Sequence, residues 1–428
     1  MSRKFFVLLA VVVGACTLSV TAASAAPAGQ AVQPTGTPAP LRASAPGITR
    51  RNVVIGTTLP LSGPASLYAR IGTGMRAYFS YINARRARDG TRGVYGRQIM
   101  LNVYDDQYNE ALTVQQTRRA VEADRVFAML GGLGTENQQA VRGYLNQRKV
   151  PQLYVSTGLS EFGSLHSQYP WTIGWQPDYV QEGILLGRYV RQSLQGAKVA
   201  VLRQNDDYGR EFLQGFLAGA GQGFVVATET YPRNGGASVI PGPVSRLRAS
   251  GADTLLVIAT PTEAVTALVT AWRIGWRPNR LVNSVAATST FMGLAQQSAG
   301  SADAVNGVVT TVYLKDCNSP TYQNDPRMVM YRAIMARYAP GQPATDCLFY
   351  YGMAKADHFV QALYRAGRNP TRASMMSATR NLTMPSPWLL PGARVITTPR
   401  SAFPIRHQKL ARYQNGQFVE FGQLQRTR

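Results

Sequence analysis

Histidine and cysteine are scarce in this sequence, with three of each among 428 residues. None of His166, His358 and His407 lies at metal-ligand spacing from a cysteine, so a metal site has little support. The chain also lacks a G-x-S-x-G elbow, an H-E-x-x-H helix and a GxxxxGK[ST] loop. The pair Asp105-Asp106 is better explained as a strand-end turn than as an acid/base dyad. We therefore expect no catalysis, no metal and no cofactor, while a histidine-based triad is unsupported but still open.

Acidic residues are also few, 22 against 45 basic ones, and the formal net charge is +23. Such a charge raises the question of a nucleic-acid partner. The arginines, however, are scattered singly or in pairs such as Arg85-Arg86 and Arg118-Arg119, without a basic run or regular aromatic interleaving. We expect no nucleic-acid binding and interpret the charge as a basic surface facing an anionic cell envelope.

Long hydrophobic runs are confined to the first residues. Arg3 and Lys4 precede an apolar run from Phe5 to Ala15, and Ala23-Ser24-Ala25 offers small residues for cleavage. This layout predicts a signal peptide over residues 1–25. No later run approaches the roughly 20 apolar residues that span a bilayer. We therefore expect an exported protein, either periplasmic or at the cell surface.

Cys16 has two interpretations. Val13-Gly14-Ala15-Cys16 resembles the bacterial lipobox, in which the cysteine carries a lipid anchor. Cys16 can equally be a small apolar residue of the signal core, because a cleavage site follows it. Residues 26–50, rich in Ala, Pro, Gly and Thr, predict a flexible linker.

Two cysteines remain for the folded part of the chain, Cys317 and Cys347. In an oxidising compartment we expect them to pair as a disulfide. A metal site is the competing interpretation for these two cysteines.

From residue 52 the chain alternates short β-rich runs with amphipathic helical stretches. We predict strands over 52–56, 99–104, 126–130, 152–155, 198–202, 225–229 and 254–259, with helices over 74–84, 111–123, 137–146, 179–194, 209–220, 262–272, 326–338 and 348–366. A closing hairpin is predicted around Asn415-Gly416. This alternation is typical of an α/β fold with doubly wound parallel sheets, and so many units suggest two lobes with a cleft between them.

Short motifs in a fixed order carry a family resemblance over nearly all of the mature chain to about residue 340. They are Val54-Ile55-Gly56, Leu61-Ser62-Gly63-Pro64, Tyr68, Asn83 with Gly96, Tyr104-Asp105-Asp106, Leu130-Gly131-Gly132, Val150-Pro151 and Asn205-Asp206-Asp207-Tyr208-Gly209. The sequence thereby resembles the branched-chain amino-acid (leucine/isoleucine/valine) binding proteins. The resemblance implies the type I periplasmic-binding-protein fold, with two α/β lobes joined by a three-strand hinge.

We accordingly expect one lobe from residues 51–174 plus about 286–388, and the other from 175–285 plus about 389–428. The implied function is capture of a small ligand, an amino acid or another small carboxylate, for delivery to an ABC permease and its ATPase. Contact with the membrane would come only through permease docking or a lipid anchor. The alternative is a ligand-sensing domain that signals to a separate receptor, and an extracellular hydrolase is a weaker one.

Thr135 is the first expected ligand contact. It follows Gly131-Gly132-Leu133-Gly134 and precedes a helix, and the resemblance implies that it binds the ligand carboxylate. Independently, glycines allow close approach and a helix N-terminus attracts anions. A structural turn or a dinucleotide-binding turn are the alternatives.

A second contact loop is implied at Ser156, Thr157 and Gly158. Gly158 departs from the family pattern, which has a threonine there, and Thr157 could substitute for it. Glu263 matches the acidic residue that receives the ligand's ammonium group, and its alternative role is a first-turn glutamate favouring the helix dipole.

Aromatic residues complete the implied site. Tyr68 and Tyr208 match residues that wall the ligand from opposite lobes. Trp175, with Trp171, falls near the first crossing between lobes, where it would either stack on a ligand at the cleft rim or pack under the hinge.

Overall fold

The structure is a computed structural model that describes residues 39–87, 90–399 and 401–426. Residues from Leu41 onward form one compact unit. The predicted signal peptide, Cys16 and most of the predicted linker lie outside the described residues, so these expectations stay predictions.

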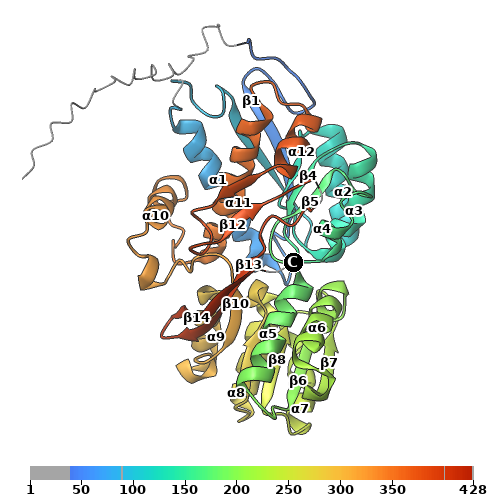
Figure 1. Cartoon of the computed structure of the whole chain (residues 1–428), viewed down its shortest axis with the longest axis vertical. Helices are drawn as coiled ribbons and strands as arrows, with labels where there is room; N and C mark the ends of the chain where they lie inside the picture. The colour runs from blue at the N-terminus through green and yellow to red at the C-terminus, as the bar shows by residue number, and fades with distance from the viewer. Residues whose placement is uncertain (1–38, 88–89, 400, 427–428) are drawn as a thin grey trace, which may run out of the picture. The chain divides into compact units, whose positions relative to one another are not determined.

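The chain alternates strands and helices, as Figure 1 shows. The strands are β1 (Asn52–Leu59), β2 (Gln98–Asp105), β3 (Met129–Leu130), β4 (Gln152–Val155), β5 (Thr172–Gly174), β6 (Val199–Gln204), β7 (Val225–Tyr231), β8 (Thr254–Ile258), β9 (Asn279–Val282), β10 (Val309–Val312), β11 (Thr383–Pro385), β12 (Arg394–Ile396), β13 (His407–Gln414) and β14 (Gln417–Arg426).

The helices alternate with these strands along the chain. They are α1 (Arg70–Ala84), α2 (Glu110–Arg118), α3 (Thr135–Gln147), α4 (Glu161–Ser164), α5 (Tyr179–Ser193), α6 (Asp207–Ala220), α7 (Pro241–Ala249), α8 (Pro261–Arg273), α9 (Ser289–Ala299), α10 (Pro326–Tyr338), α11 (Cys347–Ala366) and α12 (Arg372–Arg380).

Two main sheets define two lobes. The first is wholly parallel, in the order β2-β1-β3-β4-β5, and β1 pairs with β2 along its whole length. The second has the order β14-β13-β10-β9-β8-β6-β7, with β13 and β14 antiparallel at one edge. Strands buried on both faces, such as β8, explain the continuous apolar run Leu255–Ile258. The predicted α/β fold with two doubly wound lobes is confirmed, and so is the closing hairpin.

The chain crosses between the lobes at three places in its described part. It leaves the five-stranded sheet after β5, returns after β10 to α10 and α11, and enters the seven-stranded sheet again at β13. Helix α11 packs against α1 of the first lobe. The first part of the range 286–388, expected in the first lobe, lies in the second, because α9 packs against α8 and β10 pairs with β9 and β13.

Glycines allow the closest helix packing in the second lobe. A Cβ on Gly183 of α5 would lie 2.3 Å from the Phe212 carbonyl oxygen, and one on Gly215 of α6 would lie 2.1 Å from that of Val180. Gly187 and Gly219 face the partner backbone at 2.3 Å in the same way. These two helices therefore touch backbone to backbone, an arrangement that any side chain would prevent.

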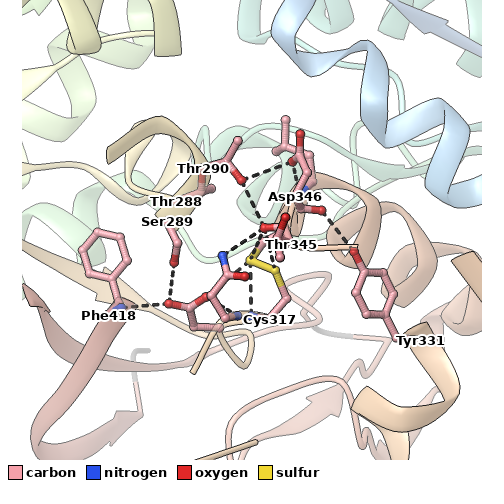
Figure 2. The surroundings of a disulfide bond; sticks show 12 residues. Thr288, Ser289, Thr290, Cys317, Tyr331, Thr345, Asp346 and Phe418 are labelled. Atoms are coloured by element: carbon pink, nitrogen blue, oxygen red, sulfur yellow. Dashed lines mark hydrogen bonds between the residues drawn. A yellow bond between two sulfur atoms is a disulfide. The ribbon is translucent and has the colours of Figure 1, made fainter. Parts of the chain in front are cut away.

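A disulfide joins Cys317 to Cys347, as predicted, with a Cα–Cα distance of 5.5 Å. Figure 2 shows it between the segment after β10 and the first residue of α11. Near it, Asp316 accepts hydrogen bonds from the Ser289 hydroxyl (2.6 Å) and the Phe418 N–H (2.8 Å). The cross-link thus ties the segment after β10 to the start of α11, while Asp316 connects the same segment to Ser289 and Phe418.

Removing the cross-link with Cys317→Ala and Cys347→Ala together should lower the free energy of unfolding by about 3 kcal/mol, because the loop is free again in the unfolded chain. Thermal denaturation of the oxidised and doubly substituted proteins measures this. Adding a reductant should destabilise the wild type and leave the double variant unchanged. A wild type insensitive to reductant would contradict the role assigned to the bond.

Candidate functional site

A cavity lies between the carboxyl edges of the two sheets and is walled by both lobes. The volume of this cavity is about 120 Å³. Its lining is rich in hydroxyl groups, contributed by Tyr68, Tyr108, Tyr179, Tyr208, Tyr313, Tyr350, Tyr351, Thr135, Ser156, Thr260, Ser284, Thr288, Ser289 and Thr311. Ser156, Thr260 and Ser284 each follow a parallel strand, the position at which such sheets bind ligands.

Thr135 lines this cavity as the first residue of α3. Gly131 and Gly134 before it have φ angles of +68° and +100°, which a side chain disfavours. The Thr135 hydroxyl lies 2.7 Å from the hydroxyl of Thr157. The start of α3 therefore offers free backbone N–H groups and a fixed hydroxyl to an anion in the cavity.

The second predicted loop divides between lining and support. Ser156 lines the cavity, and its hydroxyl donates to the Gly131 carbonyl oxygen at 2.8 Å. Thr157 lies behind Thr135, outside the lining. Gly158 also lies outside it, and a Cβ there would be 2.5 Å from the Pro177 carbonyl oxygen. Packing against that carbonyl explains why glycine replaces the threonine of the family pattern.

Tyr68 and Tyr208 both line the cavity, from the first and second lobes respectively. The Tyr68 hydroxyl donates to the Val285 carbonyl oxygen at 3.0 Å, a bond between lobes. The Tyr208 hydroxyl donates to the Ala259 carbonyl oxygen at 3.3 Å. Burial raises the pKa of both phenols well above the usual value, so they act as neutral hydrogen-bonding groups.

Glu263 is buried but does not line the cavity. It accepts a hydrogen bond from the hydroxyl of Thr260, which does line it. Glu263 can therefore act on a ligand in this conformation only through Thr260.

Trp175 lies in the core beneath the cavity and not at its rim, because its side chain is completely buried. Its ring packs edge-to-face against that of Tyr351, with 4.7 Å between the ring centroids. Its N–H donates to His358 Nδ1 at 2.9 Å. Packing under the hinge, the alternative raised from the sequence, is what the structure has.

Two buried charged residues near the cavity are absent from the sequence prediction. Lys355 of α11 donates to the Ser156 and Tyr351 hydroxyls. Glu182 of α5 accepts from the Ser284 N–H at 2.6 Å and the Ser284 hydroxyl at 3.0 Å, and burial raises its pKa to about 7. The one signal in the sequence is that each charge sits on the apolar side of a helix.

Arg233 bridges the two lobes beside the cavity. It follows β7, contacts the carboxylate of Glu110 at the start of α2, and donates to Asn137 of α3 at 2.6 Å. Its Nε lies 3.4 Å from Asp206 and 3.6 Å from Glu136. Together with the Tyr68 bond, this cluster connects the two lobes beside the cavity.

Comparison with known proteins agrees with this architecture. Residues 52–417 match the model of a family described as periplasmic binding protein. Similar solved structures include a branched-chain amino-acid ABC transporter protein from Thermus thermophilus with bound valine, which is 18% identical with a TM-score of 0.75, covering 88% of this chain and 97% of that one. No curated protein matches the chain.

Two further similar structures are named for other molecules. A solute-binding protein from R. palustris in complex with 4-hydroxybenzoate is 16% identical with a TM-score of 0.69, covering 87% and 96% of the two chains. A fatty-acid ABC transporter substrate-binding protein from Thermomonospora curvata is 18% identical with a TM-score of 0.74, covering 90% and 95%. At these identities the likeness shows the fold alone.

Because the family model spans most of the sequence, the chain belongs to the periplasmic binding protein family. The resemblance found in the sequence is thereby confirmed. The family consists of solute-binding proteins outside the cytoplasm.

Within the described residues, no helix is long and apolar enough to cross a membrane. Asp105 and Asp106 accept hydrogen bonds from Leu61 and Tyr108 N–H groups and serve as turn residues.

Proposed function

We propose that this protein captures an amino acid or another small carboxylate outside the cytoplasm and delivers it to an ABC permease and its ATPase. The observation that carries the proposal is the cavity, which both lobes wall and which the start of α3 enters with Thr135. A ligand held there would contact both lobes at once and so favour the closed shape that a permease recognises. Valine and 4-hydroxybenzoate, named with two similar structures, are small molecules that carry a carboxylate, as the proposed ligand does.

Within this proposal, Thr135 and the N–H groups at the start of α3 bind the ligand carboxylate. Glu263 receives an ammonium group, if the ligand has one, through Thr260 or after a small movement of that side chain. A buried carboxylate is costly without a matching cation or hydrogen bonds, which is why it would select an amine.

A thermal-shift screen of the mature protein with valine, leucine, 4-hydroxybenzoate and octanoate tests the proposal. A ligand at a hundredfold its Kd should add about 2.7 kcal/mol of stability. Glu263→Gln should abolish the shift with amino acids and keep the shift with carboxylates that lack an amine. Thr135→Val should weaken both classes.

Glu229→Gln is the matched control. Glu229 lies on the edge strand β7, where it pairs with Arg246 of α7. It should leave every shift as in the wild type. If none of the four compounds raises the melting temperature, the transport proposal loses its support. If Glu263→Gln leaves the amino-acid shift intact, Glu263 is a helix-start residue.

A further inference from the structure

Lys355 is a completely buried lysine without an acidic partner in the described part of the chain. Its amine donates to two hydroxyls, those of Ser156 and of Tyr351, the second at 3.3 Å. It also lies 4.8 Å from the ring centre of Trp175 and 4.6 Å from that of Tyr351. Among the described residues, the groups in contact with this amine are two hydroxyls and two aromatic rings, all of them neutral.

Such a position is costly for a cation. Desolvation by burial lowers the pKa of Lys355 well below its usual value, and no nearby carboxylate offsets it. The other lysine at the cavity differs, because Lys315 pairs with Asp325 at 2.6 Å and also donates to a backbone carbonyl. An anion close to Lys355 would oppose this shift and favour the protonated, positively charged amine.

The two hydroxyls that contact Lys355 both line the cavity. The Ser156 hydroxyl now donates to the Gly131 carbonyl oxygen, and the Tyr351 hydroxyl donates to Gln176 Oε1 at 3.0 Å. Each hydroxyl can turn its hydrogen toward an anion in the cavity and keep accepting from the amine. A single hydroxyl group would therefore connect Lys355 to a ligand bound beside Ser156 or Tyr351.

We propose that Lys355 supplies the counter-charge for an anionic group of the ligand, transmitted through the hydroxyls of Ser156 and Tyr351. The cavity then prefers a carboxylate over a neutral group of the same shape. Lys355 acts as a positioning residue, since it does not touch the ligand itself. This inference rests on the proposed function, because it names the charge that the proposed ligand must carry.

Isothermal titration with three matched pairs tests it: leucine against leucinamide, 4-hydroxybenzoate against 4-hydroxybenzamide, and octanoate against octanamide. The wild type should prefer the carboxylate of whichever pair it binds. In Lys355→Met this preference should fall by about 30-fold or more, through weaker carboxylate binding and not through weaker amide binding. A purely structural role would weaken acid and amide alike. Methionine fills a similar volume without a charge, so the variant should fold.

Lys198→Met is the control, because Lys198 is exposed and its loss removes the same formal charge. It should leave the preference unchanged. Should Lys355→Met fail to fold, Ser156→Ala provides a second test, since it removes one of the two linking hydroxyls and keeps the amine, and it should also lower the preference. If the wild type binds amides as tightly as acids, or if the variants keep the preference, the inference fails while solute binding stands. If the wild type binds no member of the three pairs, both the inference and the proposed function fail.

Discussion

Replacing Arg233 by methionine should shift the ligand-free protein toward open lobes. Arg233 is mostly buried and lies among carboxylates of both lobes, Glu110 and Glu136 on one side and Asp206 on the other. Without its charge these carboxylates repel each other across the interface. Removing one partner of a buried ion pair costs about 3–5 kcal/mol, and the partly exposed Glu110 places this site near 3 kcal/mol. The ratio of closed to open molecules should then fall by about a hundredfold.

Small-angle scattering of the ligand-free variant would measure the opening as an increased radius of gyration. Arg210→Met is the matched control, because Arg210 pairs with Asp207 on the surface, where an ion pair contributes about 0–1 kcal/mol. It should leave the radius unchanged. A variant at position 233 as compact as the wild type would show that Arg233 does not hold the lobes.

The same cluster predicts the direction of a pH effect on closure. Burial, and then the charge of Asp206, raises the pKa of Glu136 to about 7 in the closed form, above the ordinary value of 4.5. The closed form therefore binds this proton more tightly than an open form with an ordinary carboxyl. Above pH 7 Glu136 is ionised in both forms, and closure must bring its charge close to that of Asp206. As the pH falls from 7 toward 4.5, the closed form takes up the proton first, so this electrostatic cost of closure decreases. Acidification should accordingly close the Arg233→Met variant again.

Introducing a single methyl group with Gly215→Ala should destabilise the second lobe strongly. In an isolated helix this substitution is favourable by up to about 1 kcal/mol. Here the new Cβ would lie 2.1 Å from the Val180 carbonyl oxygen, far inside contact distance. Helices α5 and α6 would have to separate, and we expect a net loss of about 3 kcal/mol or more in the free energy of unfolding.

Gly143→Ala is the matched control, since Gly143 lies in α3 and a Cβ there meets nothing within 4 Å. This variant should be as stable as the wild type or more stable by up to about 1 kcal/mol. Urea denaturation of both variants measures the difference. Equal stabilities would refute the backbone contact between α5 and α6.

The strand–helix alternation is predictable from the sequence because it rests on local periodicity. The helix at 326–338 has the predicted bounds, and the strand at 152–155 does as well. Helix α7 is missed, because its Pro-Gly-Pro start and polar composition resemble a loop. Strand β10 is not predicted, and its residues fall in the range expected for the first lobe, because its pairing with β13 joins residues about a hundred positions apart.

The candidate site is predictable only where a loop motif carries it. Thr135, Ser156, Tyr68 and Tyr208 all line the cavity and all come from such motifs. Lys355 is missed because its environment depends on Ser156, which lies 199 positions away. Burial of Trp175 likewise depends on α11, which no local pattern around residue 175 reveals.

The hairpin β13–β14 has a consequence for biogenesis. Strand β13 inserts beside β10, so the hydrogen-bonding edge of β10 has no partner until residues 407–414 have been synthesised. The second lobe thus cannot complete its sheet before these residues have been made. Truncation before residue 407 would also leave a bare strand edge, which favours aggregation.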